Sequence, residues 1–483
     1  MNYYFIGIGG IGMSALARFF HRRGDKVSGY DRTPSPLTAD LESEGIAVHY
    51  DDRPDLLPEA IDLAIYTPAV PDDLGELVEL RRRGVRIEKR SQVLGEVTRS
   101  KKCIAVAGSH GKTTTSTLIA HLLSVAPCGC SAFLGGISKN FGSNLVVDRK
   151  SDYVVVEADE YDRSFLQLHP HIAVITATDP DHLDIYGTHE AMMDAYLQFA
   201  NQVDSDGHLV VKEGAFVKSD GEPYVEFGPH HHHEHHDHHD HEEEHDHHDE
   251  KSFRCHNVHT YTAHGIEADY YAINVRNYRG DLFFDLRTPD GVLFDLELCG
   301  APLVNVENAV AAAAVALKCG LDQYQLRNGL KTFQGVRRRF DYRIREKDLV
   351  YIDDYAHHPE EIRSTIESVR YLYPDKRIVG IVQPHLYSRT RDFADQFAEV
   401  LQGLDEIVMM PIYPAREKPI LGVTSSMVLR KIPSMSKYLC TADQVLELIP
   451  ALCPDVVLTL GAGDIDRLVP RLEATLREQI LNE

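Results

Sequence analysis

The chain has 483 residues, which is too long for one ordinary domain and favours about three. Hydrophobic residues make up 43% and charged residues 26%, as in a globular protein, and no apolar run approaches the roughly 18 residues that span a bilayer. The formal net charge of -24 argues against a nucleic-acid partner, because phosphate backbones are bound by a basic face. An anionic substrate would need a local basic pocket.

The N-terminus and the cysteines predict a cytoplasmic protein. The chain begins with a strand-like run and lacks the basic start, long apolar stretch and cleavage site of a signal peptide. The eight cysteines lack metal-ligand spacing, since the closest two, Cys128 and Cys130, form C-x-C. Reduced thiols with structural roles suit a reducing compartment. We therefore expect a cytoplasmic location without membrane insertion.

Strand-like and helical segments alternate in three successive units, which predicts an α/β fold with mostly parallel sheets. The first unit, residues 1–99, has predicted strands at 3–8, 27–30, 62–67 and 85–89 and helices up to about residue 23 and at 74–83. The second, residues 100–320, has strands at 103–107, 153–157 and 172–176 and helices at 114–123 and 306–318. The third, residues 321–483, has strands at 349–352, 377–382, 406–410 and 456–460.

Residues 229–250 form a low-complexity segment of histidines mixed with Asp and Glu. Such a composition cannot bury enough apolar surface to order itself, so a solvated loop is the default prediction. Imidazole and carboxylate together also ligate Zn²⁺ or Ni²⁺, which makes metal buffering the functional alternative. The internal position and the mixed acids disfavour an expression tag.

A first glycine-rich loop, G-I-G-G-I-G at residues 7–12, follows a predicted strand, precedes a helix and is followed by Asp31 about 20 residues later. Glycines let the backbone approach a pyrophosphate, and the helix N-terminus supplies N–H donors and the positive end of its dipole. The motif does not distinguish NAD, FAD or a UDP-sugar. Glycines that serve only the turn are the structural alternative.

A second loop, G-S-H-G-K-T-T at residues 108–114, also lies between a predicted strand and a helix, and it contains the Gly-Lys-Thr of a phosphate-binding loop. Lys112 and backbone N–H groups would hold the β- and γ-phosphates of a nucleotide, and the Thr113 hydroxyl would ligate Mg²⁺. The loop is shorter than the standard one, since Val106 stands where its first glycine is expected. A plain turn is the alternative.

Two acidic clusters follow predicted strands: E-A-D-E-Y-D at residues 157–162 and D-P-D-H-L-D at residues 179–184. A hard cation bound to a triphosphate needs oxygen ligands, and strand ends near the phosphate loop are where they would be supplied. His182 is flanked by carboxylates and is a candidate ligand of a second metal ion. Solvated acidic turns are the alternative.

The order of these motifs closely resembles the Mur ligases over nearly the whole chain. The further motifs of the series are N-V-E-N-A at 305–309, F-Q-G-V-R-R-R-F at 333–340, D-D-Y-A-H-H-P at 353–359, Q-P-H-L-Y-S-R-T at 383–390 and G-A-G-D-I at 461–465. The first and last motifs look like the branch of the family that adds L-alanine. Such a series is far more specific than either glycine loop alone.

The resemblance implies an N-terminal Rossmann-like domain that binds a UDP-substrate, a central P-loop ATPase-like domain and a C-terminal Rossmann-like domain, with ATP and one or two Mg²⁺ ions as cofactors. The ATP-binding residues that it implies are Gly108, Ser109, His110, Gly111, Lys112, Thr113, Thr114, Asn305, Asn308, Arg338, Arg339, Asp354 and His357. The implied metal ligands are Thr113, Glu157 and His182. The implied substrate-binding residues are Gly9, Gly10, Ile11, Gly12, Asp31, His385 and Arg389, and the implied catalytic residues are Lys112, His182, His385 and Arg389.

The chain departs from the family pattern at two places. Val304 stands where the family commonly has a histidine, directly before Asn305. The family's Ala-Gly-Glu segment reads Ala-Arg-Glu here, at residues 415–417. These departures bear on contacts with adenine and substrate and not on the class of reaction.

The implied reaction is the ATP-dependent joining of UDP-N-acetylmuramate and L-alanine during cytoplasmic peptidoglycan precursor synthesis. The lactyl carboxylate would attack the γ-phosphate to give an acyl phosphate, and the amine of L-alanine would then displace phosphate. Lys112 and Mg²⁺ would neutralise charge on the transferring phosphoryl group. The motif assigns His182 to metal binding, and the sequence does not assign a general base for the amine.

Three alternatives explain fewer of the motifs. A recycling ligase that attaches a whole tripeptide to UDP-N-acetylmuramate usually differs in the first glycine loop and after the acidic cluster. A nicotinamide-dependent dehydrogenase would use G-x-G-x-x-G and Asp31, but it leaves Gly-Lys-Thr and both acidic clusters unexplained. A histidine-rich metal-storage protein rests on residues 229–250 alone.

Overall fold

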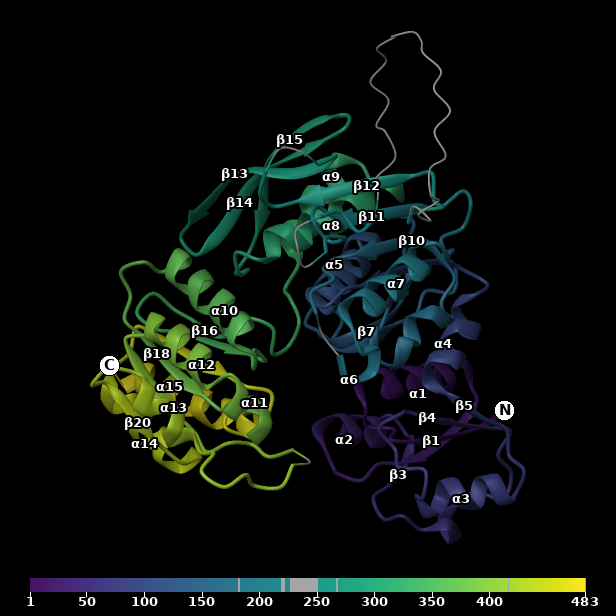
Figure 1. Cartoon of the computed structure of the whole chain (residues 1–483), viewed down its shortest axis with the longest axis horizontal. Coiled ribbons are helices and arrows are strands. Elements are labelled where there is room, and N and C mark those ends of the chain that lie inside the picture. Colours follow the sequence, from purple (N-terminus) through teal and green to yellow (C-terminus); the bar gives the residue numbers. More distant parts are fainter. Residues whose placement is uncertain (181–182, 219–221, 226–250, 266–267, 416, 483) are drawn as a thin grey trace, which may run out of the picture.

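The computed structural model describes residues 1–180, 183–218, 222–225, 251–265, 268–415 and 417–482. The strands of this part form three separate sheets of five, ten and six strands, which confirms the three α/β units (Figure 1). Among the described helices, none has the length and apolar character needed to cross a bilayer. The histidine-rich segment 229–250 and His182 lie outside the described residues.

The N-terminal unit is a parallel sheet in the order β3-β2-β1-β4-β5. Its elements are β1 (Asn2–Ile6), α1 (Ile11–Arg23), β2 (Lys26–Tyr30), α2 (Pro36–Ser43), β3 (Ala47–His49), η1 (Pro54–Leu56), β4 (Leu63–Tyr66), α3 (Gly75–Arg82), β5 (Ile87–Lys89) and α4 (Arg90–Thr98). The first glycine loop connects β1 to α1, as predicted. The chain therefore turns from the middle strand of the sheet directly into a helix N-terminus.

The central unit has the order β15-β14-β13-β12-β11-β10-β6-β9-β7-β8. Its strands are β6 (Lys102–Ala107), β7 (Ser131–Ser138), β8 (Ser143–Val146), β9 (Tyr153–Glu157), β10 (Pro170–Ile175), β11 (His208–Lys212), β12 (Val258–Thr262), β13 (Tyr270–Tyr278), β14 (Asp281–Thr288) and β15 (Gly291–Leu298). Its helices are α5 (Lys112–Ser124), η2 (Tyr161–Gln167), α6 (Leu183–Tyr186), α7 (His189–Ala200), α8 (Asn305–Lys318) and α9 (Gln323–Thr332). Strands β6, β9 and β10 are parallel neighbours, so the phosphate loop and the two acidic clusters all follow strand ends at one edge.

Helices α5 and α8 cover one face of this sheet. The alanines of α8 at residues 309, 311–314 and 316 are all fully buried, and these small side chains let α8 pack against both α5 and the strands β12 and β13. α9 also contacts α5 and β15. The predicted boundaries at residues 99 and 320 remain predictions, and the contacts of α9 favour a second boundary after Thr332.

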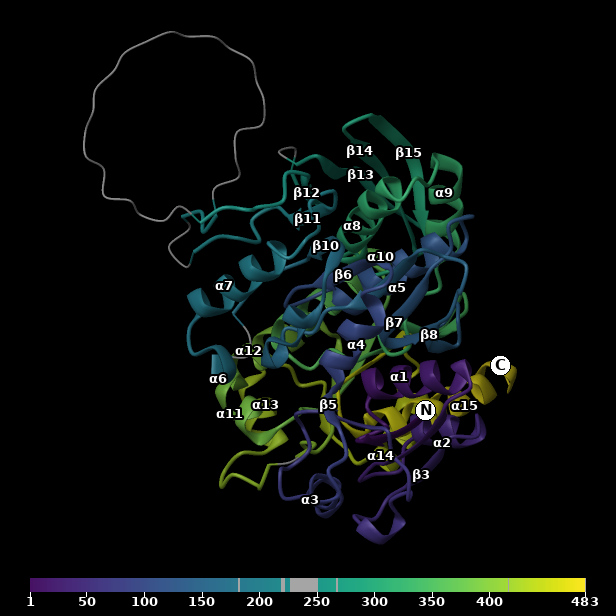
Figure 2. The same ribbon diagram turned by 90° about the vertical axis from the view of Figure 1, so that its right-hand side faces the viewer.

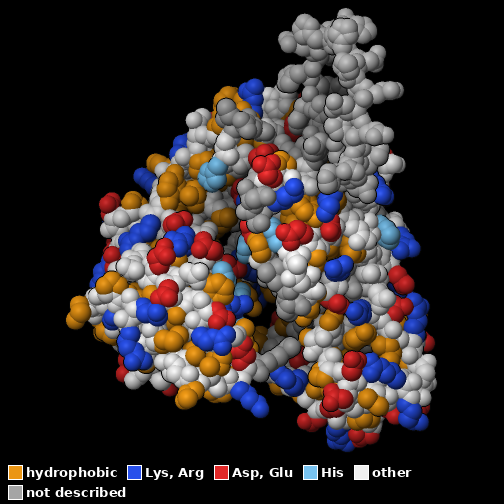
Figure 3. Space-filling view, in the orientation of Figure 1, with side chains coloured by type: hydrophobic (Ala, Val, Ile, Leu, Met, Phe, Trp, Pro, Cys, Tyr) orange, Lys and Arg blue, Asp and Glu red, His pale blue; other side chains and the backbone are white. Residues whose placement is uncertain are grey.

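The C-terminal unit has the order β16-β17-β21-β18-β19-β20, with β16 antiparallel and the other strands parallel. Its strands are β16 (Asp341–Arg345), β17 (Val350–Asp354), β18 (Ile378–Val382), β19 (Glu406–Met409), β20 (Lys437–Leu439) and β21 (Val456–Leu460). Its helices are α10 (Pro359–Leu372), α11 (Tyr387–Asp392), α12 (Ala394–Val400), η3 (Leu401–Gly403), α13 (Ser425–Lys431), α14 (Ala442–Leu452), η4 (Asp464–Arg467) and α15 (Val469–Asn482). The surface is hollowed between this unit and the N-terminal unit (Figure 3).

A buried polar network joins the N-terminal and central units where α1 packs on β7 and β8 (Figure 2). Asn144 of β8 donates to Ile11 O at 2.6 Å and to Ser14 Oγ at 2.9 Å. Its Oδ1 accepts from Arg18 Nη1 at 2.6 Å, and both side chains are almost fully buried. The first turn of α1, directly after the glycine loop, is therefore held by a side chain of the central sheet.

Asn144→Ala should lower the free energy of unfolding by about 1–3 kcal/mol, because it leaves buried polar groups of α1 without their partner. Chemical denaturation followed by circular dichroism measures this change. Ser143→Ala is the matched control on the same strand, since its hydroxyl accepts only a local bond from Leu145 N among the described contacts. Equal stability of the Asn144 variant and this control would show that the network does not hold the two units together.

Candidate active site

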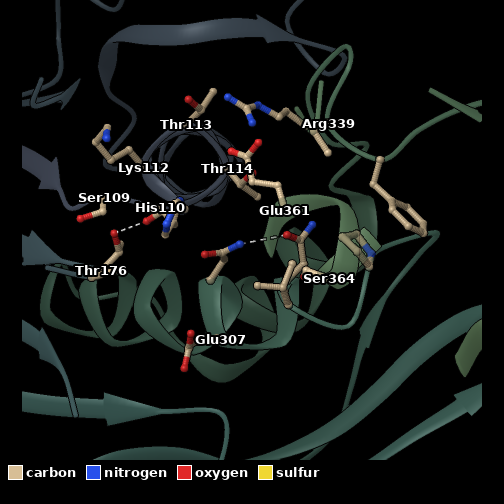
Figure 4. Close-up of a pocket in the computed structure, with 18 of the residues that line it drawn as sticks. Ser109, His110, Lys112, Thr113, Thr114, Thr176, Glu307, Arg339, Glu361 and Ser364 are labelled. Carbon is tan, nitrogen blue, oxygen red and sulfur yellow. Dashed lines mark hydrogen bonds between the residues drawn. The ribbon is translucent and has the colours of Figure 1, made fainter. Parts of the chain in front are cut away.

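A cavity of about 390 Å³ lies between the central and C-terminal units. Residues 109–114 of the phosphate loop and of α5 line it from one side, and the start of α8 lines it with Val304, Asn305 and Asn308. The C-terminal unit contributes Arg339, Asp354 and the first turns of α10 (Figure 4). Several of the predicted ATP-binding residues therefore share one cavity.

Two glycines allow the phosphate loop to fold against the neighbouring strand and helix. Gly108 has φ +138°, and a Cβ there would lie 2.1 Å from Thr176 Oγ1. Gly111 has φ +82°, and a Cβ there would lie 2.7 Å from Asn308 Oδ1. Any larger residue would combine a strained backbone with a clash. The loop thus turns tightly over the ends of β6 and β10 before α5 begins.

Lys112 is a nearly buried cation inside this loop. Its Nζ donates to Gly108 O at 2.5 Å and to Glu160 Oε1 at 2.7 Å, and its side chain is only 15% exposed. Burial by itself lowers the pKa of Lys112, but the carboxylates of Glu160 and Glu157 outweigh that effect and raise the pKa above its ordinary value. The loop therefore presents a positive charge to the cavity at every physiological pH.

Glu157, at the end of β9, has an oxygen suited to a cation. Its Oε2 is buried and has no hydrogen-bond partner among the described residues. A Cβ on Gly135 would lie 1.9 Å from that oxygen, so glycine at this position leaves the carboxylate its space. Thr113 lines the same cavity as Glu157. A buried carboxylate oxygen and a hydroxyl that line one cavity fit a hard divalent cation such as Mg²⁺.

The other acids of the E-A-D-E-Y-D motif have different partners. Asp159 Oδ2 accepts from Arg90 Nη2 at 3.0 Å, and Asp162 Oδ2 accepts from Lys89 Nζ at 2.6 Å. Only Glu157 of this motif lines the cavity. Two carboxylates of the motif therefore pair with basic residues of the N-terminal unit, and Glu157, the one predicted as a metal ligand, lines the cavity.

The asparagine pair at the start of α8 is held in a fixed arrangement. Asn308 Nδ2 donates to Asn305 Oδ1 at 2.9 Å, and Asn308 Oδ1 accepts from Thr115 Oγ1 at 3.1 Å. Val304 also lines the cavity and is 46% exposed, so an apolar surface stands where the family commonly has an imidazole. The side chain at this position therefore offers no hydrogen bond to a molecule in the cavity.

The two predicted arginines diverge. Arg339 lines the cavity, and Arg338 instead donates from Nη2 to Gly461 O at 2.6 Å. Both guanidinium groups lie 5.1 Å from the ring centre of Tyr355. Arg338 has φ +61°, a left-handed backbone conformation. Of the pair, only Arg339 is in position to touch a molecule in this cavity.

Asp354 lies at the wall of the cavity with its carboxylate already engaged. It accepts from Ala356 N at 2.9 Å, from Phe340 N at 3.2 Å and from Thr365 Oγ1 at 3.1 Å. Burial raises the pKa of Asp354 to about 6, although Arg339 opposes this shift. The residue therefore shapes the loop after β17 as well as facing the cavity.

His357, His385 and Arg389 form a second cluster outside the lining of that cavity. The ring centres of His357 and His385 are 5.7 Å apart, and Arg389 Nη1 is 3.2 Å from His385 Nδ1. Burial lowers the pKa of His385 to about 4, and the nearby His357 and Arg389 lower it in the same direction. A guanidinium can only donate, so Nδ1 accepts and the neutral imidazole carries its proton on Nε2.

The first glycine loop lies on the N-terminal sheet and does not line the described cavity. Asp31 closes this loop, since its carboxylate accepts from Gly9 N at 2.8 Å and from Thr33 N at 3.1 Å. The sequence motifs did not predict that Arg90 belongs to this site, although its guanidinium lies beside Gly12. No spacing rule links residue 90 to this loop, because only the packing of α4 against α1 brings them together.

Three family models match the chain. The Mur ligase family catalytic domain matches residues 2–102, the Mur ligase middle domain matches residues 106–245, and the Mur ligase glutamate ligase domain matches residues 338–463. These matches cover all three units of the fold.

Relatives with similar sequences cover nearly the whole chain. A UDP-N-acetylmuramate–L-alanine ligase from Porphyromonas gingivalis is 48% identical over 96% of this chain and 97% of its own length. The ligase of the same name from Phocaeicola vulgatus is 45% identical over 99% and 98%. The solved structure of UDP-N-acetylmuramate-alanine ligase from Thermotoga maritima is similar with a TM-score of 0.80 and 27% identity, covering 99% of both chains. The chain therefore belongs to the Mur ligase family.

Proposed function

We propose that this chain joins L-alanine to the lactyl carboxylate of UDP-N-acetylmuramate at the expense of ATP, giving UDP-N-acetylmuramoyl-L-alanine, ADP and phosphate. The observation that carries the proposal is the buried Lys112 ammonium inside a glycine loop, at the cavity that Glu157 also lines. The relatives that align with almost the whole chain at 45% and 48% identity bear the name of this reaction. Neither a dehydrogenase nor a metal-storage protein would require a phosphate loop with Lys112 beside a cavity that Glu157 lines.

The recycling ligase has weaker support. The murein peptide ligase from Psychrobacter arcticus has a TM-score of 0.66 and 21% identity, a likeness that bears on the fold alone. The L-alanine ligases share about twice that identity over the same length. We therefore assign the smaller substrate, a single amino acid, to this chain.

The first step transfers a phosphoryl group. A lactyl carboxylate oxygen attacks the γ-phosphorus, the bond between that phosphorus and the bridging oxygen breaks, and ADP leaves with the electron pair. Lys112 would stabilise the charge on the equatorial oxygens, and the N–H groups at the start of α5 would orient the phosphates. Asn305 and Arg339 would bind the nucleotide from the opposite walls of the cavity.

Glu157 and Thr113 would hold Mg²⁺, and His182 is retained as a proposed further ligand. A bound Mg²⁺ neutralises charge on the β- and γ-phosphate oxygens. The fit rests on the buried Glu157 Oε2, which has no protein partner among the described residues. The number of ions, one or two, depends on ligands in the segment around residue 182.

The second step forms the amide. The neutral amine of L-alanine attacks the acyl carbon, the carbon–oxygen bond to phosphate breaks with its electron pair leaving on phosphate, and the amine proton passes to that phosphate or to water. Arg389 is a cation and the neutral His385 offers an Nε2–H, so both are donors suited to carboxylate or phosphoryl oxygens. With Nδ1 occupied by Arg389, His385 is a poor candidate for the base that accepts the amine proton.

The first glycine loop, with Gly9, Gly10, Ile11 and Gly12, would bind the UDP part of the substrate. Asp31 would support this loop through Gly9 N and leave the phosphate contacts to backbone N–H groups. We further infer a cytoplasmic location and a role in peptidoglycan precursor synthesis. A Zn²⁺- or Ni²⁺-binding role of residues 229–250 remains a separate proposal.

ATP consumption should require both UDP-N-acetylmuramate and L-alanine. Release of ADP measured with a coupled assay tests this requirement, and mass spectrometry of the product identifies the new amide. ATP consumption with UDP-N-acetylmuramate and a tripeptide, but not with L-alanine, would support the recycling ligase. ATP-independent reduction of a nicotinamide cofactor would support the dehydrogenase.

Lys112→Ala should reduce turnover by roughly 10²–10³-fold, by analogy with the loss of one preorganised electrostatic contact in a transition state. Steady-state turnover at saturating ATP measures the effect. Lys331→Ala removes a largely exposed lysine of the same unit that pairs with Glu297 and does not line the described cavity, so it serves as a control. Near-normal turnover of a folded Lys112 variant would show that this loop does not hold the reacting phosphate.

His385 should stay neutral from about pH 5.5 to pH 8, because its pKa lies near 4 in the folded protein. Nitrogen-detected NMR of the imidazole, assigned with His385→Gln, should report protonated Nε2 and unprotonated Nδ1 over this range. Arg389→Gln removes a nearby cation and should raise the midpoint. A titration of the wild-type ring near pH 6.5 would contradict the buried, neutral state.

A further inference from the structure

Arg90 lies beside the first glycine loop, and the reaction described above does not use it. It is the first residue of α4, directly after β5. A Cβ added to Gly12 would come within 2.8 Å of Arg90 Nη1 and 3.2 Å of Arg90 Cζ. The guanidinium therefore lies over the backbone at the start of α1, in space that a side chain at residue 12 would occupy.

Asp159 holds this guanidinium from another side. Arg90 Nη2 donates to Asp159 Oδ2 at 3.0 Å, and the Arg90 side chain is 18% exposed. A guanidinium has five N–H donors in a planar fork, so one bond to Asp159 leaves several donors for a second anion. The N–H donors of Nη1 lie on the side of the guanidinium that faces Gly12.

The electrostatic surroundings favour an anion between Arg90 and α1. The first turn of α1 has backbone N–H groups without intrahelical acceptors and carries the positive end of the helix dipole. The only acid that contacts the loop backbone among the described hydrogen bonds, Asp31, is tied to Gly9 N and Thr33 N. In a chain of net charge -24, a pyrophosphate needs such a local cation.

We propose that Arg90 binds the pyrophosphate of the UDP-substrate, and that Asp159 is a positioning residue that aims its guanidinium at the glycine loop. The assignment rests on the proposed function, since it requires UDP at this loop. Arg90 belongs to the N-terminal unit and Asp159 follows β9 of the central sheet. The ion pair across this junction would therefore be part of the substrate site.

Binding of UDP and of uridine to the full chain tests the role of Arg90, because uridine lacks the pyrophosphate. Arg90→Ala should weaken UDP binding, measured by calorimetry, roughly 10- to 100-fold, the range for losing a hydrogen bond to a charged group. Uridine binding, measured by ligand-observed NMR, should not change. Arg90→Lys keeps the charge without the planar fork and should bind UDP with intermediate affinity.

Arg86→Ala is the matched control, since Arg86 lies four residues away and pairs with Glu88. It should bind UDP like the wild type. If the wild type binds no UDP, the proposed function of the N-terminal unit fails. If the wild type binds UDP and Arg90→Ala binds it equally well, the role of Arg90 is overturned while the proposed function stands.

Equal losses of UDP and uridine binding in Arg90→Ala would also overturn the role, because they would mark general damage to the loop. Should Arg90→Ala fail to fold, Arg90→Lys carries the same comparison of UDP with uridine. Asp159→Asn should weaken UDP binding less than Arg90→Ala does. Tighter UDP binding in Asp159→Asn would show that Asp159 competes with the pyrophosphate, which would overturn its positioning role.

Discussion

The burial of the Lys112 ammonium is the interaction on which the rest of the site depends. A buried charge costs several kcal/mol unless it is paired and hydrogen-bonded, and here Gly108 O and Glu160 provide both. The pairing requires the tight loop that Gly108 and Gly111 allow, and it requires β6 and β9 to be neighbours. The topology of the central sheet thus creates an anion site in a strongly acidic chain.

The E-A-D-E-Y-D motif distributes its charge among separate tasks. Glu160 neutralises Lys112, Glu157 faces the cavity, and Asp159 pairs with Arg90 of the neighbouring unit. Each cation near a proposed phosphate position therefore has a carboxylate beside it before a nucleotide arrives. Because Lys112 and Arg90 are both paired within the protein, neither charge is buried alone before a phosphate binds.

Apolar runs and loop motifs were sufficient to predict most parallel strands. A short apolar run bounded by turn residues is typical of a buried strand and is too short for most helices. The predicted strands at 153–157 and 456–460 coincide with β9 and β21. The antiparallel strands β13 to β15 were not predicted, since their half-exposed residues carry no continuous apolar run. For the site, the motifs predicted the nucleotide-binding role of residues 109–114, Asn305, Asn308 and Arg339, which share one cavity, but the contact of Arg338 with Gly461 depends on tertiary structure. The Arg90–Gly12 contact depends on tertiary packing and has no local signal.

Polar contacts with buried partners join the central unit to both of its neighbours. Toward the N-terminal unit, Asn144 and Arg18 are almost fully buried and hydrogen-bonded. Toward the C-terminal unit, Lys139 Nζ lies 2.7 Å from the carboxylate of Asp341, which is only 2% exposed. The pair between Arg345 and Asp281 at the same junction has side chains 35% and 25% exposed, and such partly exposed pairs contribute little to stability. A movement of the C-terminal unit that excludes water from an acyl phosphate would therefore have to keep the Lys139–Asp341 pair, because separating it would leave a buried carboxylate without this cation.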